Sequence, residues 1–171
     1  IMAVMEERGR LEELYRRHAQ ALFRFAYGLC SDRSQAEDIV AETFARILTR
    51  ADKIERGTAR AYLFAAARNV FLDGRRSAAR QARLADELAH EPAPPAPNDD
   101  DKARLAIAVH ALGALPEGER AALLLRLDHG LTYDEIAATL SISVAAAKVR
   151  VHRARLKLVE AQKSGGWDDE S

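Results

Sequence analysis

The sequence predicts an all-α protein built from two small helical domains joined by a flexible linker. Apolar residues recur at helical spacing along almost the whole chain, while the alternating pattern of a half-buried strand is scarce. Alanine and leucine, both strong helix formers, are abundant. A proline-rich stretch at residues 91–101 interrupts this pattern, and a chain of 171 residues is long enough for a small domain on each side of it.

The N-terminal domain is expected to span residues 6–90 and to contain three helices. The first runs from about Glu6 to Cys30. The second begins at Ser34, which forms a capping box with Glu37, and continues to about Arg50. Its spacing predicts a buried stripe and an opposite, exposed face. The stripe comprises Ala36, Val40, Phe44, Ile47 and Leu48, and the exposed face comprises Asp38, Glu42, Ala45, Arg46 and Thr49.

The third helix is expected to begin after Thr58 and to reach at least Asp73, with Gly74 weakening it before an arginine-rich continuation to about His90. Leu63, Ala67 and Val70 fall inward, and Tyr62, Arg68, Asn69, Leu72 and Arg76 fall outward. An outward aromatic ring and amide, together with arginines that include Arg75, suit stacking on unpaired bases and holding phosphates. An amphipathic helix with a half-buried tyrosine explains the same pattern.

Residues 91–101 are expected to be the linker, because four prolines and three aspartates oppose a helix and bury nothing. The C-terminal domain is expected at residues 102–160. Its first helices run from about Lys102 to Ala114 and from Glu117 to Asp128, the second opened by Leu115-Pro116. Residues 161–171 are expected to be a flexible acidic tail.

A helix-turn-helix is predicted at residues 132–155. Thr132 and Glu135 form a capping box after Gly130, and the turn at 141–143 ends on Ser143, the next N-cap. On the second helix Ala147, Val151, Ala154 and Leu158 form the buried stripe, with Lys148, His152 and Arg155 on one flank and Arg150, Arg153 and Lys157 on the other. Such a helix suits a DNA major groove. A solvated basic face is the plainer alternative.

Charge is sorted along the chain although the formal net charge is zero. Basic residues gather at 75–80 and 148–157, so the protein can present a local basic surface for nucleic acid although its net charge is zero. The single cysteine, Cys30, excludes an internal disulfide and is expected to be a buried structural thiol. No apolar run is long enough to cross a bilayer and no signal peptide is recognisable, so a cytoplasmic location is expected.

Enzymatic chemistry finds little support in the sequence. The five histidines are scattered, and the metal-binding, phosphate-loop and nucleophile-elbow motifs do not occur. No cofactor, metal or catalytic residue is therefore expected. The carboxylates of Asp38 and Glu42 suit a cation in principle, but such a face more often docks on a basic partner helix or is solvated.

Four ordered motifs resemble those of the bacterial extracytoplasmic-function (group four) sigma factors of RNA polymerase. They are residues 36–44, residues 61–69 with Asp73 and Arg76, residues 115–120, and residues 133–137 continuing to 153–155. The resemblance runs from about Leu11 to Leu158. It implies a factor that performs no chemistry itself and directs core polymerase to the promoters of a stress or envelope regulon.

The resemblance also implies roles for particular residues. Asp38, Glu42 and Arg46, with Ile39 at their edge, would dock on the clamp coiled coil of the β′ subunit. Tyr62, Arg68, Asn69, Arg75 and Arg76 would bind the minus-ten element, where Asn69 helps to capture an extruded base. In a domain seated on the β flap, Lys148, Val149, His152 and Arg153 would read the minus-thirty-five element, while Arg150 and Arg155 would contact its backbone.

Two further expectations rest on the resemblance alone. The linker would thread the RNA exit region of the polymerase, where Asp99 to Asp101 mimic the charge of nascent RNA. An anti-sigma protein would hold the factor inactive by wedging between the two domains.

The chain departs from the family pattern at the positions that read DNA. Tyr62 stands where the family usually has tryptophan, Ala65 and Ala66 replace bulkier residues, and residues 145–147 are Ala-Ala-Ala in place of Gly-Thr-Val. Val149 replaces a position that is usually polar. The promoter sequence therefore does not transfer from relatives. Two other classes of protein stay open: a stand-alone helix-turn-helix regulator, and a small helical metalloenzyme using Asp38, Glu42 and nearby histidines.

Overall fold

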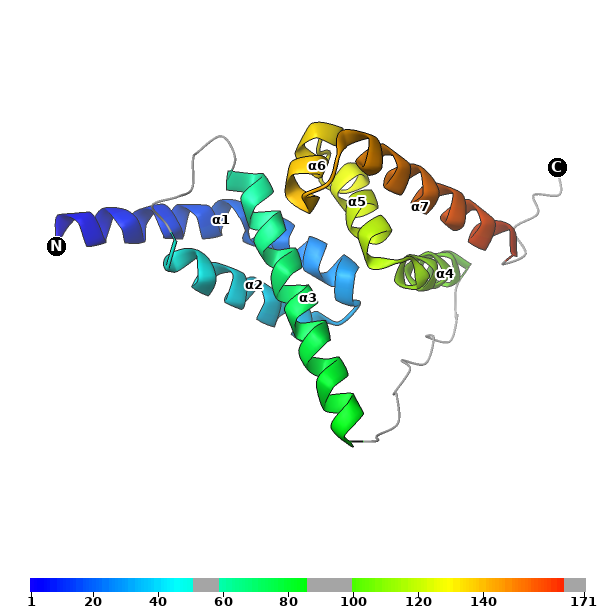
Figure 1. Cartoon of the computed structure of the whole chain (residues 1–171), viewed down its shortest axis with the longest axis horizontal. Coiled ribbons are helices and arrows are strands. Elements are labelled where there is room, and N and C mark those ends of the chain that lie inside the picture. Colours follow the sequence, from blue (N-terminus) through cyan, green and yellow to red (C-terminus); the bar gives the residue numbers. More distant parts are fainter. Residues whose placement is uncertain (51–58, 86–99, 165–171) are drawn as a thin grey trace.

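The computed structural model describes residues 1–50, 59–85 and 100–164, and within these ranges it contains helices and no strands (Figure 1). The helices are α1 (Met2–Cys30), α2 (Arg33–Leu48), α3 (Ala59–Ala85), α4 (Asp100–Ala114), α5 (Glu117–Leu127), α6 (Tyr133–Leu140) and α7 (Val144–Ser164). This confirms the all-α class. Residues 91–99 of the expected linker and residues 165–171 of the expected tail, with Trp167, lie outside the described residues.

The start of α2 differs from the prediction. Asp32 is the N-cap, and its carboxylate accepts a hydrogen bond from the Gln35 amide at 3.0 Å. Ser34 lies inside the first turn, and Glu37 instead receives the Arg33 guanidinium at 3.3 Å. The predicted Ser34–Glu37 capping box is therefore wrong. Asp32 is an equally good capping residue, and the left-handed Ser31 that closes α1 delivers the chain to it (φ 55°).

Several helix limits also shift. α1 begins at Met2, four residues before the expected start, and α2 ends at Leu48, whose side chain is 55% exposed and does not belong to the buried stripe. Thr43 is buried there instead, and its hydroxyl donates to the Ile39 carbonyl at 2.6 Å. α3 continues through Gly74 without interruption.

The C-terminal helices extend beyond the predicted limits of their domain. α4 begins at Asp100, so the backbone of Asp100 and Asp101 is helical and does not belong to the linker. α7 continues to Ser164, past the expected end of the domain at residue 160. α5 ends at Leu127, with Asp128 as its C-cap.

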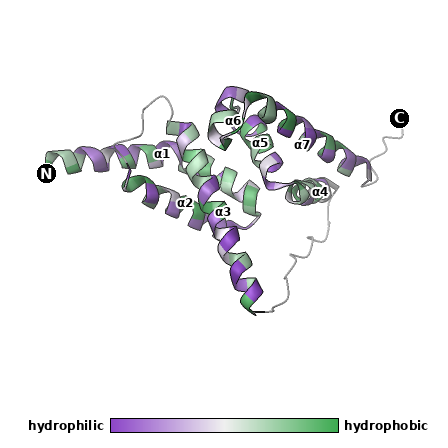
Figure 2. Ribbon diagram, viewed as in Figure 1, coloured by the Kyte–Doolittle hydropathy of each residue, from purple (hydrophilic) through white to green (hydrophobic). Residues whose placement is uncertain are grey.

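The two groups of helices pack against each other. α1, α2 and α3 form one group, α4 to α7 form the other, and α5 lies against α1 while α6 lies against α3 (Figure 1). One connected cluster of buried apolar side chains runs through both groups. Apolar and polar residues are mixed along every helix (Figure 2), as expected of helices that each bury one side.

Candidate nucleic-acid interface

The helix-turn-helix of α6 and α7 forms through local hydrogen bonds. The Thr132 hydroxyl accepts from the Glu135 amide at 3.2 Å, and the Ser143 hydroxyl accepts from the Ala146 amide at 3.0 Å. Ser141 adopts the left-handed conformation that ends α6 (φ 55°), and Gly130 does the same after α5 (φ 64°). The predicted N-caps at Thr132 and Ser143 and the turn are confirmed, although within the described residues the Glu135 carboxylate does not return the second hydrogen bond of a full capping box. With Ala147, Val151 and Ala154 buried, α7 turns its other side outward.

Five of the six residues assigned to α7 are exposed, namely Lys148, Val149, His152, Arg153 and Arg155. Arg150 is different because it folds back onto α5. Its Nη1 lies 2.7 Å from the position that a Cβ on Gly118 would occupy. Gly118 therefore provides the space that Arg150 fills, and the predicted place of Arg150 beside the DNA backbone does not match its packing here.

Tyr133 joins the two helices of the motif through its ring. The Arg126 guanidinium carbon lies 4.5 Å from the ring centroid, and the Lys148 ammonium lies 5.8 Å from it. A cation near an aromatic face is attracted by the ring quadrupole. Tyr133 therefore restrains Lys148, the first cation of α7, at the exposed end of the helix.

The α3 residues assigned to DNA differ in exposure: three are exposed, Tyr62 is half-buried, and Arg68 is covered by α5. Asn69, Arg75 and Arg76 are exposed, whereas Tyr62 is half-buried, as the plainer interpretation of this helix expects. The Arg75 guanidinium carbon lies 5.6 Å from the centroid of the Phe71 ring on the preceding turn.

Arg68 is not free. Its Nε donates to Glu117 Oε1 at 2.6 Å and its Nη2 donates to Glu117 Oε2 at 2.8 Å. The two side chains are only 17% and 13% exposed. Such bidentate pairing satisfies the guanidinium and the carboxylate together. The expectation that Arg68 lies outward and open to DNA is therefore wrong for this arrangement, because α5 of the C-terminal group covers it.

The acidic face of α2 is exposed and partly neutralised by its own arginine. Arg46 donates from Nε to Glu42 at 3.0 Å and from Nη1 to Asp73 of α3 at 2.9 Å. The hydrogen bond to Asp73, followed by that to Glu42, raises the pKa of Arg46. Asp38 is exposed and has no ion-pair partner among the described residues. The free negative charge of this face therefore centres on Asp38.

A groove of about 680 Å³ separates this face from α3. Asp38 and Glu42 contribute to one wall, and Phe71, Gly74 and Arg75 contribute to the other. Ile39 lines the same groove but is only 7% exposed. Ile39 is thus part of the core, and only a small part of its side chain is available to a partner.

The contact between the two helical groups has an aromatic centre. The His129 ring, in the loop between α5 and α6, lies 4.7 Å from the Phe64 ring and 6.0 Å from the Phe25 ring, between centroids. Arg24 of α1 pairs with Asp128, and Arg60 of α3 donates to the His129 carbonyl. The contact among the three rings is therefore flanked by an ion pair to α1 and by a hydrogen bond to α3.

Two further residues bring α5 close to α1. The Arg120 guanidinium on α5 donates to the carbonyls of Leu29, Gly113 and Leu115 at 2.5, 2.7 and 2.9 Å, and so ties α5 to the last turns of α1 and α4 and to the loop after α4. Gly28 leaves room for the side chain of Leu124, whose Cδ1 lies 2.7 Å from the position of a Cβ on Gly28. Sequence reasoning assigned no role to either contact.

Burial lowers the pKa of two histidines at this contact. Burial is the main cause of a lowered pKa at His129, and the positive charges of Arg24 and Arg60 lower it further, while Asp128 acts in the opposite direction. A small cavity between α1, α3 and the loop after α5 is lined by both His18 and His129. The pKa of His18 is also lowered, first because of burial and then because of Arg17 and Arg60. Protonation of either ring therefore opposes this packing.

Cys30 is half-buried, and its thiol donates to the Asp32 carbonyl at 3.2 Å. Burial raises the pKa of the Cys30 thiol, which suits a structural role rather than a reactive one. In the described parts of the chain, no three His, Cys, Asp or Glu side chains gather as a metal site would require. The same parts contain no helix of the length and apolar character needed to cross a membrane.

Models of the sigma-70 family match both halves of the chain. Sigma-70 region 2 matches residues 14–81, and sigma-70 region 4 matches residues 105–158. The first match covers α2 and most of α1 and α3, and the second covers the helix-turn-helix.

Two relatives and one solved structure are similar over most of this chain. It is 35% identical over 153 residues to the ECF RNA polymerase sigma factor SigE of Mycolicibacterium smegmatis, a match that covers 86% of this chain and 59% of SigE. It is 35% identical over 157 residues to the ECF RNA polymerase sigma factor SigL of Mycobacterium tuberculosis, covering 89% and 88% of the two chains. The sigma factor RpoE, in its complex with the anti-sigma factor NepR from Bartonella quintana, has a TM-score of 0.74 and 30% identity, covering 89% of this chain and 96% of RpoE.

Proposed function

Because the chain belongs to the extracytoplasmic-function (ECF) sigma factors of RNA polymerase, we propose that it binds core polymerase and grips promoter DNA at two points, one on α3 and one on α7. The observation that carries this proposal is the pairing of two faces on one chain. α3 presents an exposed amide and arginines, and α7 presents the exposed cations of a helix-turn-helix. The order of these faces along the chain follows regions 2 and 4 of the family.

In this proposal α7 reads the minus-thirty-five element as duplex. Lys148, His152 and Arg153 contact base edges, while Arg155 contacts the backbone. Val149 offers an apolar contact of the kind that a thymine methyl accepts. The Arg150 side chain packs against Gly118, which supports a packing role for Arg150 rather than a phosphate contact.

The proposed role of α3 is to open the minus-ten element. Asn69 is exposed and suits hydrogen bonding to an extruded base, while Arg76 on the same side of α3 suits phosphates. Arg75 lines the groove beside α2, so it would reach phosphates from the neighbouring side of the helix. Arg68 joins this face only after Glu117 releases it. Promoter opening therefore requires α5 to move away from α3.

We assign core polymerase to the exposed acidic face of α2. Asp38 and Glu42 lie one turn apart on this face and suit a basic helix of the β′ clamp. The pairs between Arg46 and both Glu42 and Asp73 fix the face against α3. Arg46 thus acts mainly as a positioning residue, and Ile39 contributes only its exposed edge. The C-terminal domain would then rest on the β flap, with the linker in the RNA exit region.

Control by an anti-sigma protein is proposed from the relative RpoE, which was solved with the anti-sigma factor NepR. In the present chain the two helical groups contact each other directly, so an inhibitor that wedges between them must first displace contacts such as Arg68–Glu117. An inhibitor that binds across the outer faces would instead preserve them. The factor needs no cofactor in this scheme and acts in the bacterial cytoplasm, where the polymerase makes the RNA.

The experiment that tests the proposal mixes purified core polymerase with this chain and measures complex formation and binding to promoter DNA. A sigma factor is expected to form a complex with core polymerase and to bind promoter DNA tightly only within that complex. Tight binding to duplex operator DNA by the chain alone, without polymerase, would favour a stand-alone regulator. A stoichiometric metal ion in the purified protein would favour the metalloenzyme.

A further inference from the structure

His152 is the one histidine of α7, and its side chain is exposed. Lys148 lies one turn before it and Arg155 one turn after it, on the same flank of the helix. Val149 and Leu156 border His152 on its other side and are 44% and 50% exposed. The His152 ring therefore stands in the middle of the surface that α7 presents to solvent, between two cations and two apolar side chains.

The His152 ring has no partner among the residues that the structure describes. Its side chain makes no hydrogen bond, ion pair or ring contact there. Of the helices packed on α7, α5 directs Glu119 to Lys157 at 2.8 Å, and α6 directs the Tyr133 ring to Lys148. No described side chain of α4, α5 or α6 places a charge on His152. Both ring nitrogens are therefore free to bind a ligand that approaches α7 from solvent.

The two forms of an imidazole ring present different groups to a base. In the neutral ring one nitrogen donates a hydrogen bond and the other accepts one, whereas in the charged ring both nitrogens donate. In the major groove guanine presents two acceptors, N7 and O6, and cytosine presents the N4 donor. A charged ring therefore favours guanine and opposes cytosine. A neutral ring adapts to either base, because either of its tautomers can form.

We propose that protonation of His152 changes the base that α7 prefers at one position of the minus-thirty-five element, toward guanine at acidic pH. This inference rests on the proposed function, which places the exposed side of α7 in the major groove. Lys148, Arg153 and Arg155 keep their charge over the range in which a histidine titrates. The binding that these three cations provide therefore persists, while the base preference at His152 changes. One holoenzyme then favours different promoters at neutral and at acidic pH.

The test measures the affinity of holoenzyme, assembled from core polymerase and this chain, for duplex probes made from a promoter fragment that the holoenzyme transcribes. Each pair of probes carries a G·C pair at one position of the minus-thirty-five element, in one orientation or the other. At one position the ratio of the two affinities is expected to change about tenfold between about pH 7.5 and 5.5, because the charged fraction of an ordinary histidine rises about tenfold over this range. A general effect of pH on the domains or the polymerase acts on both probes and cancels in the ratio.

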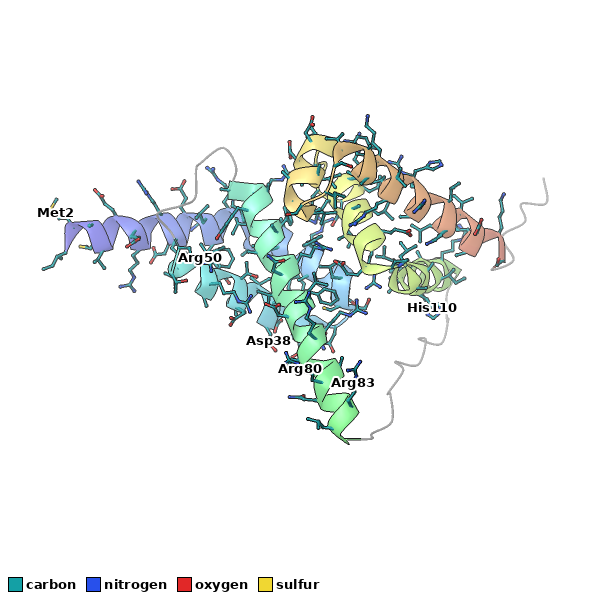
Figure 3. The ribbon with its side chains drawn as sticks, in the orientation of Figure 1. Met2, Asp38, Arg50, Arg80, Arg83 and His110 are labelled. Carbon is teal, nitrogen blue, oxygen red and sulfur yellow. The ribbon has the colours of Figure 1, made fainter. Side chains whose placement is uncertain are left out.

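Two variants of His152 separate its charged form from its neutral form. His152→Lys keeps a positive donor at both pH values, and is expected to favour at both the orientation that wild type favours at acidic pH. His152→Gln cannot gain a charge, and its ratio is expected to be the same at both pH values. The matched control is His110→Gln, which removes an exposed histidine from α4 (Figure 3) and is expected to keep the wild-type change.

A wild-type preference that is the same at both pH values at every position would overturn the inference. So would a change with pH that survives in His152→Gln or is lost in His110→Gln, because the response would then belong to other groups. A His152→Lys variant that favours the opposite orientation would also overturn it. Wild-type holoenzyme that binds every probe equally would contradict the proposed function itself, and that result is distinguishable from a clear sequence preference that pH leaves unchanged.

Discussion

The Arg68 guanidinium on α3 is held by both carboxylate oxygens of Glu117 on α5, at 2.6 and 2.8 Å, and so joins the N-terminal helices to the C-terminal ones. The pair is mostly shielded from water, so removing one partner leaves the other charge buried and unpaired. It also occupies an arginine that the proposed function needs at the minus-ten element. In the proposed function, the contact between the two groups therefore opposes promoter opening.

Glu117→Gln is expected to loosen this contact, because a neutral amide accepts a charged hydrogen bond less well than a carboxylate. A hydrogen bond to a charged group contributes about 1.5–3 kcal/mol, which corresponds to about tenfold or more in the equilibrium between packed and separated domains. Small-angle X-ray scattering of the free chain is expected to show a larger radius of gyration for the variant than for wild type.

Glu119→Gln is the matched control for this prediction. Glu119 lies two residues along α5 and pairs with Lys157 at 2.8 Å within the C-terminal group, so its loss leaves the contact with α3 intact. The same radius of gyration for both variants would mean that the Arg68–Glu117 pair does not hold the domains together.

Acidic pH is expected to separate the domains. The pKa of His129 is lowered in the packed form because the ring is buried among Phe25 and Phe64. Asp128 opposes this shift and Arg24 and Arg60 add to it, with burial the largest effect. The stabilisation is therefore complete above the ordinary histidine pKa of about 6.5 and is lost as the pH falls through and below it. The radius of gyration is expected to rise as the pH falls from about 6.5 to 5.5.

Two histidines contribute to this pH response, so the control removes both. His18 lines the same cavity and also has a lowered pKa. The double variant His18→Gln/His129→Gln is expected to lose the rise in this range, and His129→Gln alone is expected to reduce it. A rise of unchanged size and midpoint in the double variant would assign the response to other groups.

Charge reversal on α2 is expected to prevent assembly with core polymerase. Asp38→Lys/Glu42→Lys replaces two exposed carboxylates and would repel a basic clamp helix. Pull-down of core polymerase is the measurement, and circular dichroism checks that helicity is retained. Glu37→Lys alters the same helix outside the predicted docking face and is expected to bind as wild type does. Unchanged affinity of the double variant would move the docking site elsewhere.

Arg153→Ala is expected to weaken binding of the minus-thirty-five element by about 1–3 kcal/mol if Arg153 contacts a base. If it contacts a phosphate, the salt slope is expected to fall by about one unit. Arg150→Ala, three residues away, is expected to change neither quantity, because Arg150 packs on Gly118. A larger DNA-binding loss for Arg150→Ala than for Arg153→Ala would reverse the two assignments.

Local features of the fold could be predicted from the sequence, and long-range ones could not. The caps at Thr132 and Ser143 formed as expected because a cap involves residues three positions apart. Asp32 and Ser34 are both good capping residues and lie two positions apart, and the local pattern alone does not decide that Asp32 is the N-cap. Ile39 was predicted at the edge of the exposed docking face, next to Asp38, but its side chain is buried. Its burial depends on how α2 packs against the other helices, which the sequence of α2 alone does not give.

The spacing of apolar residues along the sequence does not reveal which residues join the two domains. Arg68 and Glu117 are separated by 49 positions and by the linker, so their pairing depends on how the domains meet. Gly28 and Gly118 provide space for Leu124 and Arg150 respectively, and a glycine gives no sign in the sequence of which side chain it accommodates. Asn69 and Arg76 of α3 are therefore exposed as predicted, whereas Arg68 is covered by α5.

The most direct measurement of the central claim is run-off transcription from genomic fragments by core polymerase with and without this chain. We predict discrete new start sites that depend on the chain, and their loss when Asp38→Lys/Glu42→Lys replaces the wild type. If core polymerase with the chain produces the same transcripts as core polymerase alone, the chain does not act as a promoter-directing factor.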